Sequence, residues 1–79
     1  MAGLILYGTE ACHLCDEAEL LLRQHGLDFE KRDIIDDEHA QQRYAIRIPV
    51  LRDDASGLEL GWPFDASAIA DFVARLKRG

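Results

Sequence analysis

The chain has 79 residues, of which 48% are hydrophobic and 30% are charged. This balance is typical of a globular protein rather than a disordered one, and the length predicts one domain over residues 1–79. The formal net charge is -6, and residues 1–40 hold ten acidic and three basic side chains. An acidic surface repels phosphates, which argues against nucleic acid or an anionic membrane as the main partner.

The first expected element is a buried strand over residues 4–7, an apolar run with a glycine on each side. This run is too short for a signal peptide or a membrane span, so we expect a soluble, cytoplasmic protein. We also expect it to be a monomer. A helix is expected next, capped by Thr9 and ended by His25 and Gly26. Its apolar positions follow helical spacing: Ala11, Leu14, Cys15, Ala18, Leu21 and Leu22.

Residues 27–34 begin with apolar and charged residues in alternation. This pattern predicts an edge strand, on which the charges discourage pairing with another sheet. A short helix with Asp36 as its cap is expected to follow and to run to about Tyr44. Pro49 prevents any helix from continuing across it.

The last part of the chain predicts a hairpin and a helix. Residues 50–52 and 58–60 flank a polar loop of suitable length for a hairpin. Asp65 is the expected cap of the final helix, and Phe64 is expected to close onto Ile69 as a hydrophobic staple. The apolar face of this helix is formed by Ile69, Phe72, Val73 and Leu76. The order of elements predicts an α/β fold with a four-stranded sheet, its first two strands parallel, and helices on both faces.

The two cysteines lie three positions apart, in the run Cys12-His13-Leu14-Cys15. A disulfide between them encloses almost no chain and removes little entropy from the unfolded state, so chemical reactivity explains the pair better than stability. Cys12 is expected in the first turn of its helix, where free N–H groups and the helix dipole favour a thiolate. Cys15 is expected to be buried one turn later. We therefore predict that Cys12 is the nucleophile and Cys15 the resolving thiol.

Opposing charges act on the pKa of the Cys12 thiol. His13 can stabilise the thiolate by donating a hydrogen bond or by its positive charge, although a solvent-exposed helix residue is an equally good interpretation. The carboxylates of Glu10, Asp16 and Glu17 raise the pKa, because they disfavour a second negative charge. The sequence leaves the balance open.

A structural zinc site is the rival use of two cysteines at this spacing. Such a site needs about four ligands, and the residues that could complete it are His13, His25 and His39. Their spacing fits no usual zinc motif, so no metal is expected.

Two segments resemble the glutaredoxin branch of the thioredoxin-fold superfamily. They are Leu-Ile-Leu-Tyr-Gly-Thr-Glu-Ala-Cys-His-Leu-Cys-Asp (4–16) and Arg-Ile-Pro-Val-Leu (47–51). The Cys-His-Leu-Cys motif is most similar to that of short bacterial glutaredoxin-like proteins, and the resemblance covers essentially the whole chain. It implies the thioredoxin-like order βαβ-α-ββα with a mixed sheet. It also implies that Pro49 follows a cis peptide bond and faces Cys12, and that the Ile48 backbone pairs with an extended substrate.

Two departures from the glutaredoxin pattern concern glutathione. Residues 9–11 (Thr-Glu-Ala) stand where glutaredoxins usually have a Lys or Arg, and residues 61–65 (Gly-Trp-Pro-Phe-Asp) replace their Gly-Gly. The resemblance still implies that Asp65 could bind the amino group of a ligand, and Arg43 or Arg47 its carboxylate. Because glutathione is anionic and the surroundings of the cysteines are acidic, we expect inefficient glutathione binding.

The sequence thus predicts a small dithiol oxidoreductase without a tightly bound cofactor. Its expected partners are a disulfide-bearing protein or a low-molecular-weight thiol, and the reductant is either glutathione or a thioredoxin-like system. The alternative is a non-catalytic binding module. In that case Cys12 would ligate an iron–sulfur cluster shared by two protomers, or the fold would serve as an adaptor.

Overall fold

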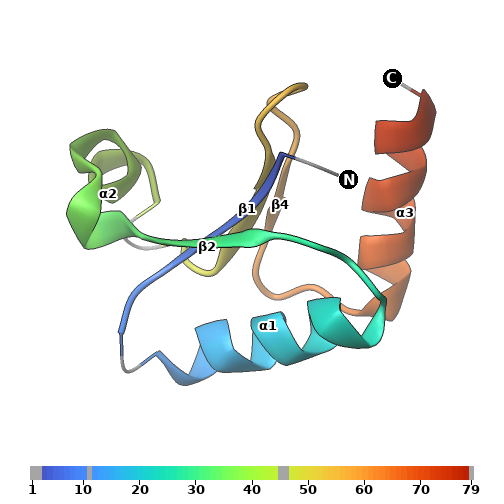
Figure 1. Cartoon of the computed structure of the whole chain (residues 1–79). Coiled ribbons are helices and arrows are strands. Elements are labelled where there is room, and N and C mark those ends of the chain that lie inside the picture. Colours follow the sequence, from blue (N-terminus) through green and yellow to red (C-terminus); the bar gives the residue numbers. More distant parts are fainter. Residues whose placement is uncertain (1–2, 11, 45–46, 79) are drawn as a thin grey trace.

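The computed structural model describes residues 3–10, 12–44 and 47–78, which form a sheet flanked by helices (Figure 1). The elements in chain order are β1 (Leu4–Gly8), α1 (His13–Gln24), β2 (Glu30–Asp33), a 3₁₀ helix (Ile34–Asp36), α2 (Glu38–Tyr44), β3 (Val50–Asp53), β4 (Glu59–Gly61) and α3 (Ala66–Arg78). No helix in the described part of the chain is long and apolar enough to span a membrane.

The four strands form one mixed sheet in the order β2-β1-β3-β4. β1 and β2 are parallel, whereas β3 is antiparallel to both of its neighbours. Helices α1 and α3 pack on one face of the sheet, and α2 packs on the other. The expected thioredoxin-like fold class, with its order βαβ-α-ββα, is confirmed.

The central strand β1 is buried on both faces. Leu4 and Leu6 belong to the core that contains α1 and α3, whereas Ile5 and Tyr7 belong to the core that contains α2. Successive side chains of a strand point to opposite faces, so an unbroken apolar run is what a strand between two helical layers requires.

The start of α1 differs from the expectation. Thr9 is not its cap: the helix begins at His13, and Cys12 is the N-cap residue, with its sulfur accepting a hydrogen bond from the Cys15 N–H at 3.1 Å. The cysteine sulfur therefore takes the role that a threonine hydroxyl commonly fills.

The apolar face of α1 is also narrower than expected. Its buried residues are Cys15, Ala18 and Leu22. Leu14 lies at the margin of this stripe and is 46% exposed, so the expectation that it lies on the buried face was wrong. Ala11, expected on the same face, lies outside the described residues.

The connection after α1 shows two further corrections. The strand expected over 27–34 is shorter, because its neighbour β1 pairs with it only from Ile5 onward, opposite Glu30. Leu27 and Phe29, which precede it, pack against the core beneath α1 and α3. The cap of α2 is Asp37 rather than Asp36. An Asp37 carboxylate oxygen accepts hydrogen bonds from the N–H groups at positions 39 and 40, at 3.0 and 3.2 Å.

The start of α3 agrees with the expectation. Asp65 accepts a hydrogen bond from the Ala68 N–H at 2.9 Å and so caps the helix. Phe64 and Ile69, the two residues of the expected staple, are both buried in the same core.

One ion-pair cluster links α1 to β2. The Glu19 carboxylate is 2.9 Å from Lys31 Nζ in β2 and 2.9 Å from Arg23 Nη2 one helical turn further on. Hydrogen bonds from Lys31 and Arg23 hold the pKa of Glu19 below its ordinary value of 4.5.

Replacing this carboxylate tests how much the cluster stabilises the fold. We expect Glu19→Gln to lower the free energy of unfolding at neutral pH by about 0.5–1 kcal/mol, as for partly exposed ion pairs. Because the folded-state pKa is depressed, this stability is present above pH 4.5 and is lost as the pH falls through the folded pKa. Urea unfolding should therefore show the two proteins converging in acid. Glu17→Gln, which removes an exposed carboxylate of the same helix, is the control. A difference from wild type that stays constant in acid would contradict the prediction.

Candidate active site

Three loops lie at one end of the sheet, where its strands begin or stop. In the strand register, β1 ends where β3 begins and where β4 ends. The loops that continue from these three strand ends contain Cys12, the Ile48–Pro49 peptide bond and Asp65. The segments singled out in the sequence are thus gathered at the same end of the molecule.

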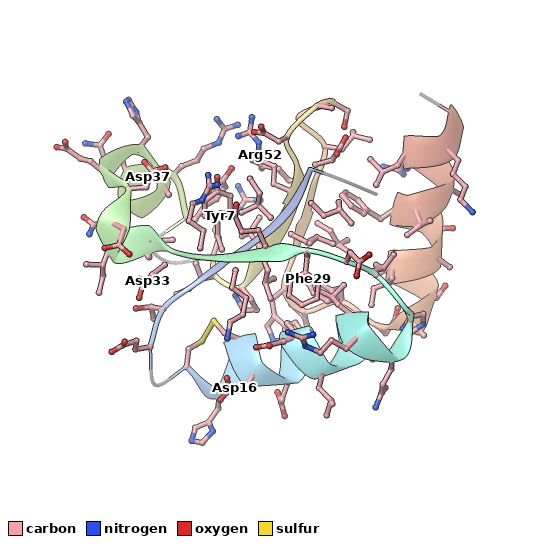
Figure 2. The ribbon with its side chains drawn as sticks, in the orientation of Figure 1. Tyr7, Asp16, Phe29, Asp33, Asp37 and Arg52 are labelled. Carbon is pink, nitrogen blue, oxygen red and sulfur yellow. A yellow bond between two sulfur atoms is a disulfide. The ribbon has the colours of Figure 1, made fainter. Side chains whose placement is uncertain are left out.

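Cys12 and Cys15 form a disulfide at the start of α1, with their Cα atoms 5.2 Å apart (Figure 2). Cys12 is partly exposed, whereas Cys15 is 9% exposed and lies on the buried face of α1. The Cys12 sulfur accepts the Cys15 N–H at the positive end of the helix dipole. One sulfur is therefore partly accessible and receives an N–H donor, whereas the other is shielded.

Gly8, at the end of β1, contacts the shielded sulfur. A Cβ atom at this position would lie 2.8 Å from Cys15 Sγ and 3.3 Å from Cys15 Cβ. The strand must therefore end in a residue without a side chain for Cys15 to occupy its place. Sequence reasoning treated this glycine only as the end of a strand, although its place four residues before Cys12 was a usable signal.

Substitution of this glycine should disfavour the disulfide. We expect Gly8→Ala to lower the equilibrium constant for closing the Cys12–Cys15 bond by about tenfold, because overpacking by one methyl costs roughly 1–3 kcal/mol and the closed bond fixes the sulfur most tightly. Titration in a redox buffer, followed by the mass of alkylated protein, measures the constant. The control is Gly61→Ala, whose added Cβ would meet only Arg47 Nη2, at 3.7 Å. Equal constants for the two variants would show that the Gly8 contact has no such role.

The Ile48–Pro49 peptide bond is cis, as the resemblance implies. The N–H groups of Arg47 and Ile48 donate to the Tyr44 carbonyl at 2.8 and 3.0 Å, and the Trp62 N–H donates to the Pro49 carbonyl at 3.1 Å. Within the described ranges, no backbone N–H donates to the Ile48 carbonyl. Of the two backbone hydrogen-bonding groups of Ile48, the carbonyl is thus the one left for a substrate.

Of the other predicted site residues, His13 and Asp65 lie at the starts of α1 and α3. His13 is exposed as the first residue of α1. Asp65 is also exposed, but one of its carboxylate oxygens is engaged in capping α3. Arg43 and Arg47, offered by the resemblance as carboxylate ligands, both approach Glu59, at 3.5 and 4.0 Å.

Trp62, which follows β4, is partly buried. Its ring packs edge-on against Phe64, with ring centroids 5.0 Å apart, and contributes to the core beneath α1 and α3. The aromatic side chain therefore has a packing role at the edge of the candidate site.

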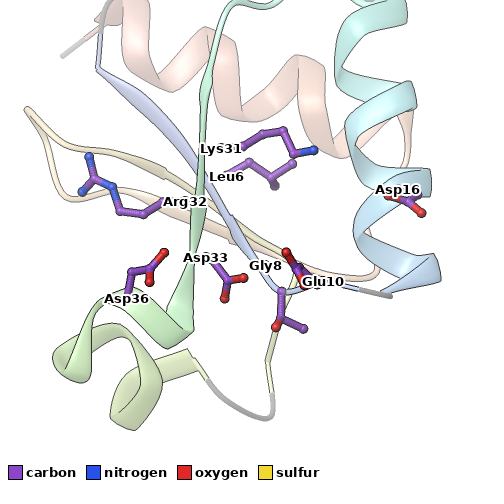
Figure 3. A pocket seen from close by; sticks show the side chains of 9 residues that line it. Leu6, Gly8, Glu10, Asp16, Lys31, Arg32, Asp33 and Asp36 are labelled. Atoms are coloured by element: carbon purple, nitrogen blue, oxygen red, sulfur yellow. The ribbon is translucent and has the colours of Figure 1, made fainter.

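A cavity of about 390 Å³ lies between the end of β1, β2 and Asp16 of α1 (Figure 3), and its lining includes Gly8, the residue that contacts Cys15. Its acidic lining residues are Glu10, Asp16, Asp33 and Asp36. Lys31 and Arg32 also line it, but each is ion-paired with a glutamate that does not line the cavity. Carboxylates therefore dominate the charge next to the cysteine pair.

In the part of the chain that the structure describes, no three His, Cys, Asp or Glu side chains are grouped so that they could hold a metal ion. The chemistry that the arrangement supports is that of the two sulfurs. An accessible sulfur with an N–H donor, within bonding distance of a shielded one, is suited to thiol–disulfide exchange.

A family model described as a glutaredoxin-like domain (DUF836) matches residues 3–74 of the chain. No curated protein matches the chain. Among solved structures, the chain is similar to the X-ray structure of Northeast Structural Genomics target protein XcR50 from X. campestris, with 41% identity, a TM-score of 0.81, and coverage of 91% of this chain and 96% of that one. The solution structure of XcR50 matches with 40% identity, a TM-score of 0.79, and coverage of 92% and 94%. The solution structure of protein Ne2328 from Nitrosomonas europaea has 34% identity and a TM-score of 0.69, with 87% of each chain covered.

Proposed function

The chain belongs to the glutaredoxin-like domain family, and from this premise we propose that it is a dithiol oxidoreductase that reduces disulfides with Cys12 and Cys15. The observation that supports the proposal best is the difference between the two sulfurs. The Cys12 sulfur is accessible and hydrogen-bonded at a helix N-terminus, and the Cys15 sulfur is buried against Gly8.

The proposed reaction begins from the reduced pair. The Cys12 thiolate attacks one sulfur of the substrate disulfide, which forms a mixed disulfide and releases the other substrate sulfur as a thiolate that takes up a proton. Cys15 then loses its proton and attacks the Cys12 sulfur, which closes the Cys12–Cys15 bond and releases the second substrate thiol. The substrate disulfide gains two electrons and two protons overall, and the protein dithiol is oxidised.

The local structure supports this order of attack. The Cys15 N–H and the dipole of α1 stabilise negative charge on the Cys12 sulfur. Burial disfavours a thiolate at Cys15, so this residue reacts only when the mixed disulfide lies next to it. A cellular reductant, either glutathione or a protein dithiol, must then reopen the Cys12–Cys15 bond.

The test compares two serine variants in a disulfide reduction assay. We expect Cys12→Ser to reduce the rate to that of the uncatalysed reaction, because the attacking sulfur is gone. Cys15→Ser should still attack but should accumulate a mixed disulfide at Cys12, visible in the intact protein mass. Activity that survives in Cys12→Ser would overturn the assignment. A visible absorbance band in anaerobically purified protein that disappears in Cys12→Ser would instead favour the iron–sulfur alternative.

The acidic cavity predicts weak use of glutathione. Glutathione is an anion, and the carboxylates beside the disulfide repel it. We expect Glu10→Lys to lower the KM for glutathionylated substrates several-fold, with a gain that shrinks as added salt screens the charges. Asp71→Lys makes the same change of net charge on α3 and serves as the control. An equal gain in both variants, or none in either, would show that the cavity charge does not limit glutathione use.

A further inference from the structure

The side chain of Tyr44, the last residue of α2, is fixed at both of its ends. It is 2% exposed, and its ring stacks on that of Tyr7 with centroids 4.9 Å apart. Its hydroxyl donates a hydrogen bond to the Glu59 carboxylate and accepts one from Arg52 Nη1 at 3.3 Å. Figure 2 shows Tyr7 and Arg52 on the face of the sheet opposite α1. Tyr44 is thereby tied to three strands through its side chain.

The backbone of the same residue holds the loop that ends in the cis proline. The Tyr44 carbonyl accepts the N–H groups of Arg47 and Ile48. These are the two residues directly before Pro49. A displacement of Tyr44 would therefore move the Ile48 carbonyl as well.

Glu59 of β4 also connects Tyr44 to the loop before Pro49, through its contacts with arginines. Its side chain is only 16% exposed and lies between three arginines. The three are Arg52 of β3 at 3.8 Å, Arg43 of α2 at 3.5 Å and Arg47 of the loop at 4.0 Å. One carboxylate thus contacts α2, the loop and a neighbouring strand. Burial, together with the hydrogen bond to Glu59, raises the pKa of Tyr44 above 10.0, which keeps its hydroxyl protonated as a donor.

We propose that Tyr44 and Glu59 are positioning residues that fix the Ile48–Pro49 segment for an extended polypeptide substrate. The inference rests on the proposed disulfide reduction and on the backbone pairing at Ile48 that the resemblance implies, and it adds the two side chains that hold the Ile48 carbonyl in place. Among the described residues, no side-chain hydrogen bond or ion pair joins either residue to the cysteine pair, so both act through the loop. Reduction of a small disulfide that makes no backbone hydrogen bond does not depend on the position of the Ile48 carbonyl.

The two kinds of substrate separate positioning from chemistry. The probes are a linear peptide whose cysteine carries a mixed disulfide with 2-mercaptoethanol, and hydroxyethyl disulfide. We expect Tyr44→Phe, which removes only the hydroxyl, to raise the KM for the peptide about tenfold with kcat unchanged, the loss typical of one hydrogen bond to a charged partner. The kcat/KM for hydroxyethyl disulfide and the rate of Cys12 alkylation by iodoacetamide should not change. A merely structural defect would alter all of these quantities together.

Tyr7→Phe is the matched control, because it removes the hydroxyl of the stacked ring without touching Glu59. If Tyr44→Phe does not fold, Glu59→Gln decides the question, since it removes the charge at constant size and should show the same selective loss for the peptide. Equal losses on both substrates, or no loss on either, would overturn the positioning role. Failure of the proposed function looks different: the wild-type protein would reduce neither probe, or Cys12→Ser would reduce both.

Discussion

Burial of β1 on both faces is the constraint on which the rest of the structure depends. Its alternate side chains enter two different cores, so a shift of one residue in its pairing would exchange the two sets. The register with β2 and β3 is therefore firmly set, and with it the place where the strand ends. Gly8 lies at that end and receives the Cys15 sulfur. The position of the disulfide is thus a result of core packing rather than of the loop that contains the cysteines.

The parts of the fold that could be predicted are those determined by the residue pattern of a short stretch of chain. The apolar run of β1, the hairpin and the final helix each depend on local spacing, and Asp65 has beside it Phe64, the expected staple residue. The start of α2 offers two neighbouring capping residues, Asp36 and Asp37. Near the start of α1, Thr9 belongs to the preferred capping types, but the residue that caps the helix is Cys12, which does not. Propensity alone does not choose between such neighbours, because the winner depends on where the strand before the helix ends.

In the candidate site, too, features set by local sequence could be predicted and features set by tertiary contacts could not. The different exposure of the two cysteines follows from the helical pattern, and the cis bond before Pro49 came from the family resemblance. The connection between Tyr44 and Glu59 joins residues that are 15 positions apart and share no motif. In the sequence, Glu59 and the arginines around it are indistinguishable from ordinary solvated surface residues. Their contacts arise only when the sheet places β4 next to the end of α2. Contacts that depend on tertiary structure leave no periodic signal in the sequence.

The N-cap of α1 connects electron transfer with folding. In the disulfide, the Cys15 N–H donates to a neutral sulfur, whereas after reduction the same N–H would face a thiolate and form a charge-assisted hydrogen bond. A thermodynamic cycle then relates two quantities that are measured separately: any extra folding stability of the dithiol form over the disulfide form adds equally to the affinity of the folded pair for electrons. In so small a domain, selection for a given redox poise is also selection on the stability of this helix end.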